Sequence, residues 1–407
     1  MAFNSLEKRA LFGLGTLYAA RMLGLFMVLP VLTLYGQHLL GASTQTLGLA
    51  LGIYGVTQAL LQIPLGMLSD RFGRKPVILA GLLVFFAGSV LAALADDVLW
   101  LIVGRALQGS GAIASVVLAL LADYTRDGER TKAMAIVGAV IGGSFVLAVM
   151  VGPWLAGGFG LAGPFWATAA LALLSMLILL WLPQPPAPTV HRERQWRGSQ
   201  LGAVLRDRQL TPLSLGIFCL HLTMTALFVG LPVMLTRQGV ADAHLGWIYA
   251  PVMVLSFVAM APLIMIAERR RLHVPVLLFA AALVLVATLL LGVNRWLVLS
   301  IGLTWLFFVG FNLIEASLPS LLSRRAPADA RGTAMGLFST GQFLGAACGG
   351  ALGGWAFSRF DQIGIAVLGV TLMALWMLVL WWAERNSIEG GSNTAAGSES
   401  TSAARHN

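Results

Sequence analysis

The chain has 407 residues, of which 58% are hydrophobic and only 11% are charged. A soluble domain carries about 25% charged residues, so this composition indicates a membrane protein. The formal charge of +9 does not point to nucleic acid, because the basic residues lie between apolar segments and form no continuous face.

Apolar segments of about 20 residues, the length that crosses a bilayer, recur along the chain. We predict twelve such spans, and the short connections between several of them make neighbouring helices antiparallel. The first has no small-residue cleavage site behind it and is too long for the core of a signal peptide. The approximate bounds are 10–35, 46–69, 76–95, 98–122, 133–157, 161–183, 210–236, 243–267, 274–293, 296–322, 333–357 and 362–383.

The first two spans carry polar residues at membrane depth. Arg21 lies in the first span, and a charge in the bilayer is costly enough to mark a functional candidate. Because no acid lies within one helical turn of it, Arg21 is interpreted either as a gate or as an attractor of anionic substrate. Gln58 and Gln62 on the second span are expected to be polar lining residues of a cavity.

The second span ends in an unusually charged turn, "GMLSDRFGRKPVIL". Asp70 falls near the C-terminal end of that helix, where the partial negative charge of the helix disfavours an acid. Asp70 therefore needs a partner, which is either a guanidinium group of Arg71 or Arg74 or the N-terminus of another helix. We predict that it caps the helix beginning at Arg331, in "RGTAMG", and so latches two parts of the chain together.

Other residues of this turn fit the same hypothesis. Gly66 would permit a close helix approach, and Gly73 would take a left-handed conformation after the helix end. Asp123, at the end of the fourth span, is a second acid within reach of the arginines. The alternative is that the charges, Lys75 among them, are ordinary topology signals; this accounts for the basic residues but not for Asp70 or the glycine spacing.

The fourth span contains a second intramembrane cation, Arg105, in "LIVGRALQGSGA". Its partners could be backbone carbonyls, a neighbouring carboxyl group or the moving proton, and a structural role remains as an alternative. Gly104, Gly109 and Gly111 allow tight helix contact beside it. Gln108 is another expected polar lining residue.

The second half of the chain holds the other two titratable groups inside spans, His221 in the seventh and Glu315 in the tenth. Burial favours a neutral carboxyl group that binds and releases a proton, so Glu315 is the predicted proton site. The alternative is a structural acid satisfied by Asn312 or a backbone group. His221 could share the proton or hold a polar group of a substrate, or it could be a hydrogen-bonded packing residue.

Further side chains are predicted to line a substrate cavity, with plain packing as the alternative for each. Asn312 and Gln342 add to the polar set. The apolar set is Tyr18, Phe26, Met27, Met224, Phe228, Trp305, Phe308 and Phe311.

Between the sixth and seventh spans lies the longest interior polar segment, which contains "PQPPAP" and suits a linker. The predicted organisation is therefore a six-helix half at 1–183, a basic linker at 184–209 and a second six-helix half at 210–384. The Ser-, Gly- and Ala-rich segment at 385–407 is predicted to be a disordered polar tail.

The two halves repeat each other at an offset of about 200 residues. Pro64 precedes Asp70 by six residues, as Pro262 precedes Glu268. Similarly, "RTKAM" follows the fourth span and "RGTAM" follows the tenth. Repeated halves joined by a linker indicate a secondary transporter with its site at the repeat interface.

The basic residues also set an orientation. With a cytoplasmic N-terminus, twenty-one of the 26 Lys and Arg residues fall in cytoplasmic segments. The opposite side holds Arg237, Arg295 and Arg359, and two more lie inside spans. The excess of positive charge on one side predicts that both termini and the charged turn face the cytoplasm.

The charged turn resembles the signature turn of the major facilitator superfamily, and the resemblance extends to about Glu384. "LIVGRALQGSGA" resembles the fourth-span motif with its buried arginine, and "LGLFMVLPVL" the first-span motif of twelve-span drug:proton antiporters, with Leu34 replacing a usual proline. "GPWLAGG", containing Gly152, Pro153 and Gly157, resembles an antiporter motif of the fifth span. Ala148 and Ala156 stand where that motif usually has glycine.

The resemblance implies an all-α membrane fold of two pseudo-symmetric six-helix halves, with the first, fourth, seventh and tenth helices lining a central cavity. It also implies a coupling role for Arg105 and a multi-pass location in a bacterial inner membrane. The expected activity is proton-coupled export of small amphipathic organic molecules or drugs. The expected partners are a small-molecule substrate, protons and lipid; we expect no cofactor, no metal and no nucleic acid, and a monomer.

Two other functions remain open. One is a symporter or facilitator that imports a nutrient, and the other is a non-transporting membrane sensor on the same fold. An intramembrane enzyme is disfavoured, because the six histidines are scattered and no nucleophile elbow or paired carboxylates occur in a span. The chain also lacks a phosphate-binding loop for ATP-driven transport.

Overall fold

A computed structural model describes residues 3–184, 198–270, 272–327 and 330–403 of the chain. In the first half these fold into α1 (Ser5–Phe26), α2 (Leu32–Tyr35), η1 (Gly36–His38), α3 (Thr44–Phe72), α4 (Arg74–Ala93), α5 (Val98–Ser110), α6 (Ala114–Tyr124), α7 (Asp127–Phe159) and α8 (Ala162–Trp181). The second half contains α9 (Gly198–Arg206), α10 (Thr211–Arg237), η2 (Asp242–His244), α11 (Leu245–Arg269), α12 (His273–Val293), α13 (Leu297–Arg325) and α14 (Arg331–Ala403).

The helices account for all twelve predicted spans. Ten helical stretches of the described chain are long and apolar enough to cross a membrane. One of them, Gly332–Arg385 within α14, is 54 residues long and crosses twice, because the chain bends at Asp361, where φ is 52°. Helix α1 supplies the remaining crossing. The predicted all-α fold of two six-helix halves is confirmed.

Two predicted spans are interrupted. The first ends at Phe26 and resumes at Leu32, because Pro30 lacks a backbone N–H and its ring clashes with the preceding helical turn. The fourth is divided at residues 111–113. There a Cβ atom at Gly111 would lie 2.6 Å from the carbonyl oxygen of Gly81, so the crossing with α4 requires glycine, which also weakens the helix.

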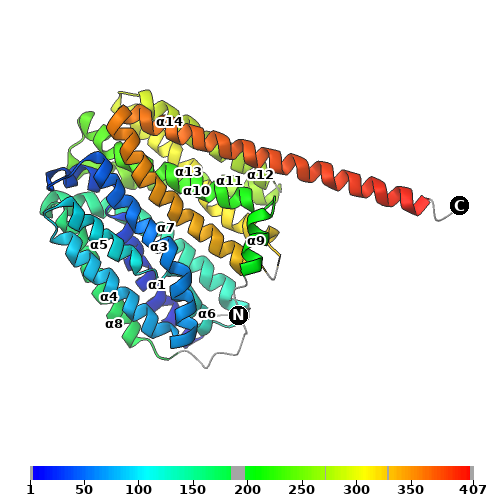
Figure 1. Cartoon of the computed structure of the whole chain (residues 1–407), viewed down its shortest axis with the longest axis horizontal. Coiled ribbons are helices and arrows are strands. Elements are labelled where there is room, and N and C mark those ends of the chain that lie inside the picture. Colours follow the sequence, from blue (N-terminus) through cyan, green and yellow to red (C-terminus); the bar gives the residue numbers. More distant parts are fainter. Residues whose placement is uncertain (1–2, 185–197, 271, 328–329, 404–407) are drawn as a thin grey trace.

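The segments flanking the second half differ in part from the prediction. Residues 185–197 of the predicted linker lie outside the described residues, whereas 198–206 form α9, which buries Val204 against the second half. The predicted disordered tail is helical to Ala403 in the structure, where α14 extends beyond the bundle (Figure 1). Adding residues to an existing helix needs no new nucleus, which favours this continuation.

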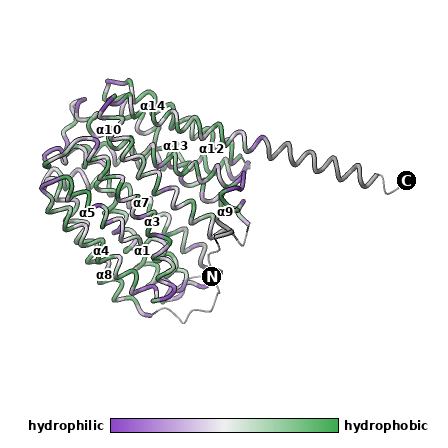
Figure 2. Tube along the Cα trace, viewed as in Figure 1, coloured by the Kyte–Doolittle hydropathy of each residue, from purple (hydrophilic) through white to green (hydrophobic). Residues whose placement is uncertain are grey.

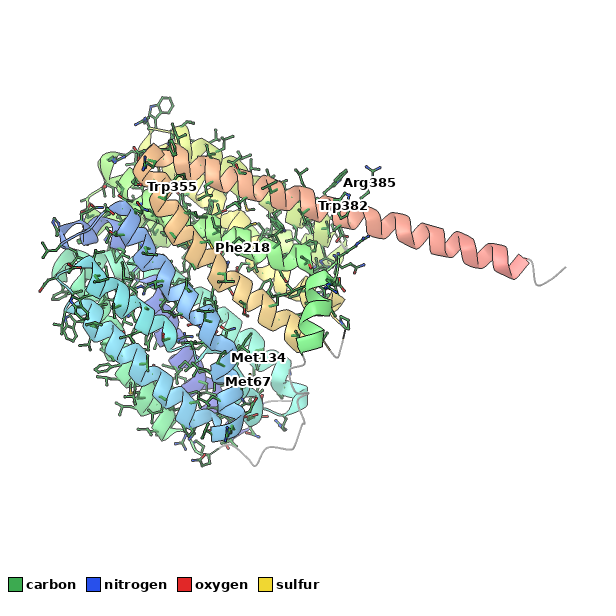
Figure 3. All side chains as sticks on the ribbon, in the orientation of Figure 1. Met67, Met134, Phe218, Trp355, Trp382 and Arg385 are labelled. Carbon is green, nitrogen blue, oxygen red and sulfur yellow. The ribbon has the colours of Figure 1, made fainter. Side chains whose placement is uncertain are left out.

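The surface of the bundle matches a bilayer. Figure 2 shows apolar residues along the lengths of the helices and hydrophilic residues gathered toward both ends of the bundle. Large apolar side chains are exposed around it, such as Trp247, Trp296 and Val298. In Figure 3, Trp355 lies at one end of the bundle and Met67 toward the other.

Among the described residues, the close glycine contacts between α3 and α14 lie at one of these ends. A Cβ atom at Gly48 would lie 2.8 Å from Gly354 Cα, and one at Gly55 would lie 2.5 Å from the carbonyl oxygen of Phe343. These contacts join the first turns of α3 to α14, and the two helices diverge toward the end where α9 and the N-terminus lie (Figure 1). At that end, a Cβ atom at Gly332 or Gly336 would meet no atom within 4 Å.

Candidate functional site

Glu315, His221 and Gln342 form one polar cluster in the second half, each from a different helix. The Gln342 amide nitrogen of α14 donates to Glu315 Oε1 of α13 at 3.1 Å. The same nitrogen lies 2.9 Å from His221 Nε2 of α10. Nδ1 of His221 lies 3.8 Å from Glu315 Oε2. The structure therefore brings together two titratable residues that the sequence predicted as functional and one predicted lining residue.

The hydrogen-bond partners define the protonation state that fits this arrangement. His221 Nδ1 lies 3.2 Å from the Ile217 carbonyl oxygen, which can only accept, so Nδ1 carries a proton. Nε2 is then free to accept from the Gln342 amide, and the imidazole is neutral. The two N–H groups of one amide thus serve His221 and Glu315 together.

The Glu315 carboxyl group is incompletely satisfied. Its Oε2 atom is buried and has no hydrogen-bond partner. Asn312, the alternative structural partner, instead donates to Ser256 Oγ at 2.8 Å. At a buried oxygen without a partner, an added proton would relieve the cost of a buried negative charge.

The first half holds the two buried arginines, joined through Tyr54. Arg21 Nη2 donates to Gln58 Oε1 and lies 3.3 Å from the Tyr54 hydroxyl group. The guanidinium carbon of Arg105 lies 4.8 Å from the centre of the Tyr54 ring. Arg105 also donates from Nε to the Ala50 carbonyl oxygen at 3.3 Å and from Nη1 to Gln108 at 2.8 Å.

Arg105 is therefore bound by carbonyl groups and an aromatic face, as one of its predicted alternatives expected. None of the ion pairs formed by the described residues involves Arg21 or Arg105. Each glutamine that is bonded to an arginine also donates to a further polar side chain: Gln108 to Ser89 at 2.8 Å and Gln58 to Gln62 at 3.5 Å. Tyr54 was not predicted from the sequence, although its position one turn before Gln58 places both on one helix face.

Aromatic side chains join the two halves between these polar clusters. The ring of Phe26 on α1 meets that of Phe145 on α7 at 4.7 Å. Phe145 in turn contacts Phe228 of α10 at 6.4 Å and Phe308 of α13 at 6.1 Å. Phe311 continues the cluster to His221, 5.6 Å away. Phe145 could not be predicted from the sequence, because no periodic pattern distinguishes it from other apolar residues of its span.

The remaining predicted lining residues lie in or beside this region. Tyr18 and Met224 are buried, Met27 is buried beside the α7 backbone at Gly152, and the indole nitrogen of Trp305 is buried without a hydrogen-bond partner. Because Met224 and Trp305 pack against the apolar core of the second half, packing accounts for their position in this structure.

The charged turn forms a compact network within the first half. Arg74 pairs with Asp70 through Nη1, and its Nε atom lies 3.4 Å from Asp123 Oδ2. Arg74 also donates to Ser69 Oγ at 2.7 Å. Lys75 donates to the Leu182 carbonyl oxygen, whereas the Arg71 guanidinium lies over the Phe72 ring at 5.4 Å. The structure thus places Asp123 beside an arginine of the turn, as predicted.

The predicted latch between the halves is not formed in this structure. Asp70 is exposed, and its partner among the described residues is Arg74 rather than the start of α14. A Cβ atom at Gly66 would have only an ordinary contact, 3.8 Å from Ser115, so no close helix approach occurs there. Gly73 has a positive φ of 93°, but its ψ of 151° lies outside the left-handed helical region and in one open essentially to glycine. The latch remains a prediction for a conformation closed at this end.

The Gly-Pro motif lies where the halves meet. Gly152 packs against the backbone of Met27, and Pro153 lies inside α7. A Cβ atom at Gly157 would lie 2.6 Å from the Cβ atom of Ala243, which belongs to the second half. Small residues at these positions therefore set how closely α7 approaches both α1 and the second half.

The two pseudo-symmetric six-helix halves, with polar clusters facing an aromatic interface, identify the protein as a membrane transporter. The sequence comparison agrees. The chain matches the Major Facilitator Superfamily over residues 14–347 and again over 213–405, and it belongs to this family. It is 46% identical over 376 residues to the inner membrane transport protein YajR of Escherichia coli, covering 92% of this chain and 83% of that one.

More distant similarities are found both to a protein sequence and to a solved structure. The multidrug resistance protein MdtH of Yersinia pestis is 28% identical over 376 residues, covering 90% of this chain and 93% of its own. Among solved structures, a bacterial homologue of the human lysosomal transporter Spinster, in an inward-facing and occupied conformation, superposes with a TM-score of 0.80. That match is 15% identical and covers 94% of this chain and 98% of the other.

Proposed function

We propose that the protein is a proton-coupled antiporter of the inner membrane that exports small amphipathic organic molecules. The observation that carries this proposal is the Glu315–Gln342–His221 cluster. It places an incompletely satisfied carboxyl group and a neutral imidazole at membrane depth, where ionisable groups commonly relay protons. Export of drug-like molecules is supported by the similarity to MdtH and by the Gly-Pro residues of α7.

Alternating access supplies the mechanism. The halves touch at the end formed by the first turns of α3 and separate at the end of the charged turn. With both termini cytoplasmic, this is a conformation open to the cytoplasm. Substrate enters there, protonation of Glu315 biases the equilibrium between the two conformations, and Asp70 latches the cytoplasmic end when it closes.

Three residues would couple the proton to this movement. Glu315 binds and releases the proton, and the Gln342 amide holds the carboxyl group beside His221. His221 and Glu315 lie on different helices, so a change in their hydrogen bonds alters the contact between α10 and α13. Arg105 holds the helices of the first half together through the Ala50 carbonyl group and Tyr54.

The test is proton movement in oriented liposomes with a panel of cationic, anionic and neutral drugs and dyes. Antiport predicts that a transported compound drives protons in the opposite direction, and that Glu315→Gln abolishes this flux. Thr340→Val is the control, because among the described residues the Thr340 side chain bonds the Gly336 carbonyl oxygen of its own helix. Flux of proton and compound in the same direction would instead show a symporter, and an unchanged Glu315→Gln variant would move the proton site to His221.

A further inference from the structure

Arg21 is a buried cation of the first half, and two of its nitrogen atoms have no hydrogen-bond partner among the described residues. Its side chain is 3% exposed, yet Nε and Nη1 have no protein partner. Only Nη2 is engaged, by Gln58 and the Tyr54 hydroxyl group. A guanidinium group has five N–H donors, so three of those on Arg21 are unpaired.

Arg105 provides an internal comparison: it is equally buried, but none of its nitrogen atoms is both fully buried and without a hydrogen-bond partner among the described residues. Its Nε and Nη1 atoms both donate to protein oxygens, and the Tyr54 ring covers its charge. The fold can therefore give an arginine at this depth neutral partners at two of its three nitrogen atoms. Arg21, which contacts the Tyr54 hydroxyl group, has hydrogen-bond partners at Nη2 alone, and a buried charge or donor without a partner is costly.

The charge balance at membrane depth points to the missing partner. Two arginines lie inside the spans, whereas Glu315 is the only carboxylate that we place there, and it lies in the other half with Gln342 and His221. Two guanidinium groups contact one tyrosine, Arg21 at its hydroxyl group and Arg105 at its ring, and they give the first half an uncompensated positive charge. An anion with several oxygen acceptors matches both this charge and the unpaired donors.

The surroundings indicate an organic anion rather than a simple ion. Phe26 lies five residues beyond Arg21 on α1, about 8 Å along the helix axis, and it opens the aromatic cluster that joins the halves. Arg21 lies about 17 Å along α1 from the start of the predicted span, near the middle of a hydrocarbon layer about 30 Å thick. Lipid headgroups at the surface do not reach that depth.

We infer that Arg21, with Gln58 and Tyr54, is the subsite for the acidic group of an amphipathic organic anion, whose apolar part packs on the aromatic cluster of Phe26, Phe145 and Phe308. This inference rests on the proposed transport function and narrows its substrate to carboxylates and related organic acids. The anion supplies the oxygen acceptors that Arg21 lacks, and binding places it between the two halves, where substrate must lie to influence their movement.

The test is equilibrium binding, measured by calorimetry on the full chain in phosphatidylcholine nanodiscs, with empty nanodiscs as the reference. The probes are benzoate, 2-naphthoate and octanoate, each compared with the amine and the alcohol that carry the same apolar group. At least one carboxylate is expected to bind about tenfold or more tightly than its amine and alcohol. If no carboxylate shows this preference in the wild-type protein, the inference is overturned, and Arg21 serves only as an internal counter-charge.

Variants test whether Arg21 causes the preference for carboxylates. Arg21→Gln is expected to bind the carboxylate no better than the alcohol, whereas Arg21→Lys, which keeps the charge, retains part of the preference. Arg295→Gln removes the same charge from an exposed position and is expected to bind as wild type. Wild-type carboxylate affinity in a folded Arg21→Gln variant would overturn the assignment of the site to Arg21. If the variant does not fold, the comparison of carboxylate, amine and alcohol in the wild-type protein still tests the inference.

Two further measurements are needed. One distinguishes an organic anion from a lipid phosphate at Arg21, and the other tests the anion subsite separately from the proton-coupled function. Adding phosphatidylglycerol to the nanodiscs is expected to change carboxylate affinity less than twofold. Complete loss of carboxylate binding would show that a lipid phosphate occupies the site at Arg21. Because binding is measured without a proton gradient, Glu315→Gln is expected to keep the carboxylate preference. Lost preference with intact proton flux would overturn the anion subsite alone, and intact preference without substrate-driven proton flux would overturn the proton-coupled function alone.

Discussion

Glu315 Oε2 and His221 Nδ1 lie 3.8 Å apart, although 94 residues separate them in the chain. They are too far apart for a direct hydrogen bond, and the Gln342 amide bridges them from a third helix. The cluster therefore depends on the packing of α10, α13 and α14, so a proton gained or lost there acts on all three helices.

Gln342 is expected to be needed for coupling. Gln342→Leu removes the donor to Glu315 and to His221, and a hydrogen bond to a charged group contributes about 1.5–3 kcal/mol. Substrate-driven proton flux in liposomes should fall about tenfold or more, with Thr340→Val as the control on the same helix. Equal rates in the two variants would show that the amide does not link the two titratable groups.

Asp70 is expected to matter for transport but little for the stability of this conformation. Here its exposed carboxylate pairs with Arg74, which lies across the helix break at Gly73, and exposed pairs contribute about 0.2–1 kcal/mol. Asp70→Asn should leave the thermal midpoint nearly unchanged while lowering substrate-driven transport. Glu268→Gln, the equivalent change in the second half, is the control; unaltered transport by Asp70→Asn would rule out the latch.

Gly52 is expected to control how closely the halves meet. A Cβ atom there would overlap the Ala347 carbonyl oxygen of α14. Gly52→Ala should weaken the closed end by about 1–3 kcal/mol and lengthen the distance between spin labels at Ser43 and Arg359. At Gly143, a Cβ atom meets nothing within 4 Å, so Gly143→Ala is the matched control. Identical label distances in both variants would contradict a tight contact at Gly52.

Glu7 links stability to pH at the start of α1. Its buried carboxylate accepts from Arg126 at 2.9 Å and from the backbone N–H of Asn4 at 2.8 Å. The hydrogen bond from Arg126, above all, lowers the pKa of Glu7 from 4.5 to about 2. Because the pKa is lower in the folded state, this stabilisation is complete above pH 4.5 and is lost as the pH falls toward 2.

The corresponding variant gives a measurable difference. Glu7→Gln should lower the thermal midpoint at about pH 7, by the equivalent of about 1–2 kcal/mol, and the gap to wild type should narrow as the pH falls from about 5 to about 3. Glu268→Gln breaks an exposed pair with Arg324 and should change the midpoint far less. A gap that does not vary with pH would show that the charge on Glu7 is not the source of the stabilisation.

Much of the architecture could be predicted from the sequence. The length of a bilayer crossing fixes a minimum run of apolar residues, so twelve spans and two repeated halves follow from the pattern of apolar and charged residues alone. The interruptions are harder to predict. Pro30 signals the break after Phe26, but the break at Gly111 arises because the α4 backbone approaches that glycine, and such an approach is a tertiary contact.

The sequence by itself determined which residues are chemically exceptional: Arg21, Arg105, His221 and Glu315 stand out because charge is rare at membrane depth. Only the tertiary structure decided how they group. It joined His221 to Glu315 through Gln342, and Arg21 to Arg105 through Tyr54, and it left Asp70 paired with Arg74. The physical reason is that composition and periodicity report the cost of burying each residue alone, whereas partners depend on which helix faces meet and in which conformation.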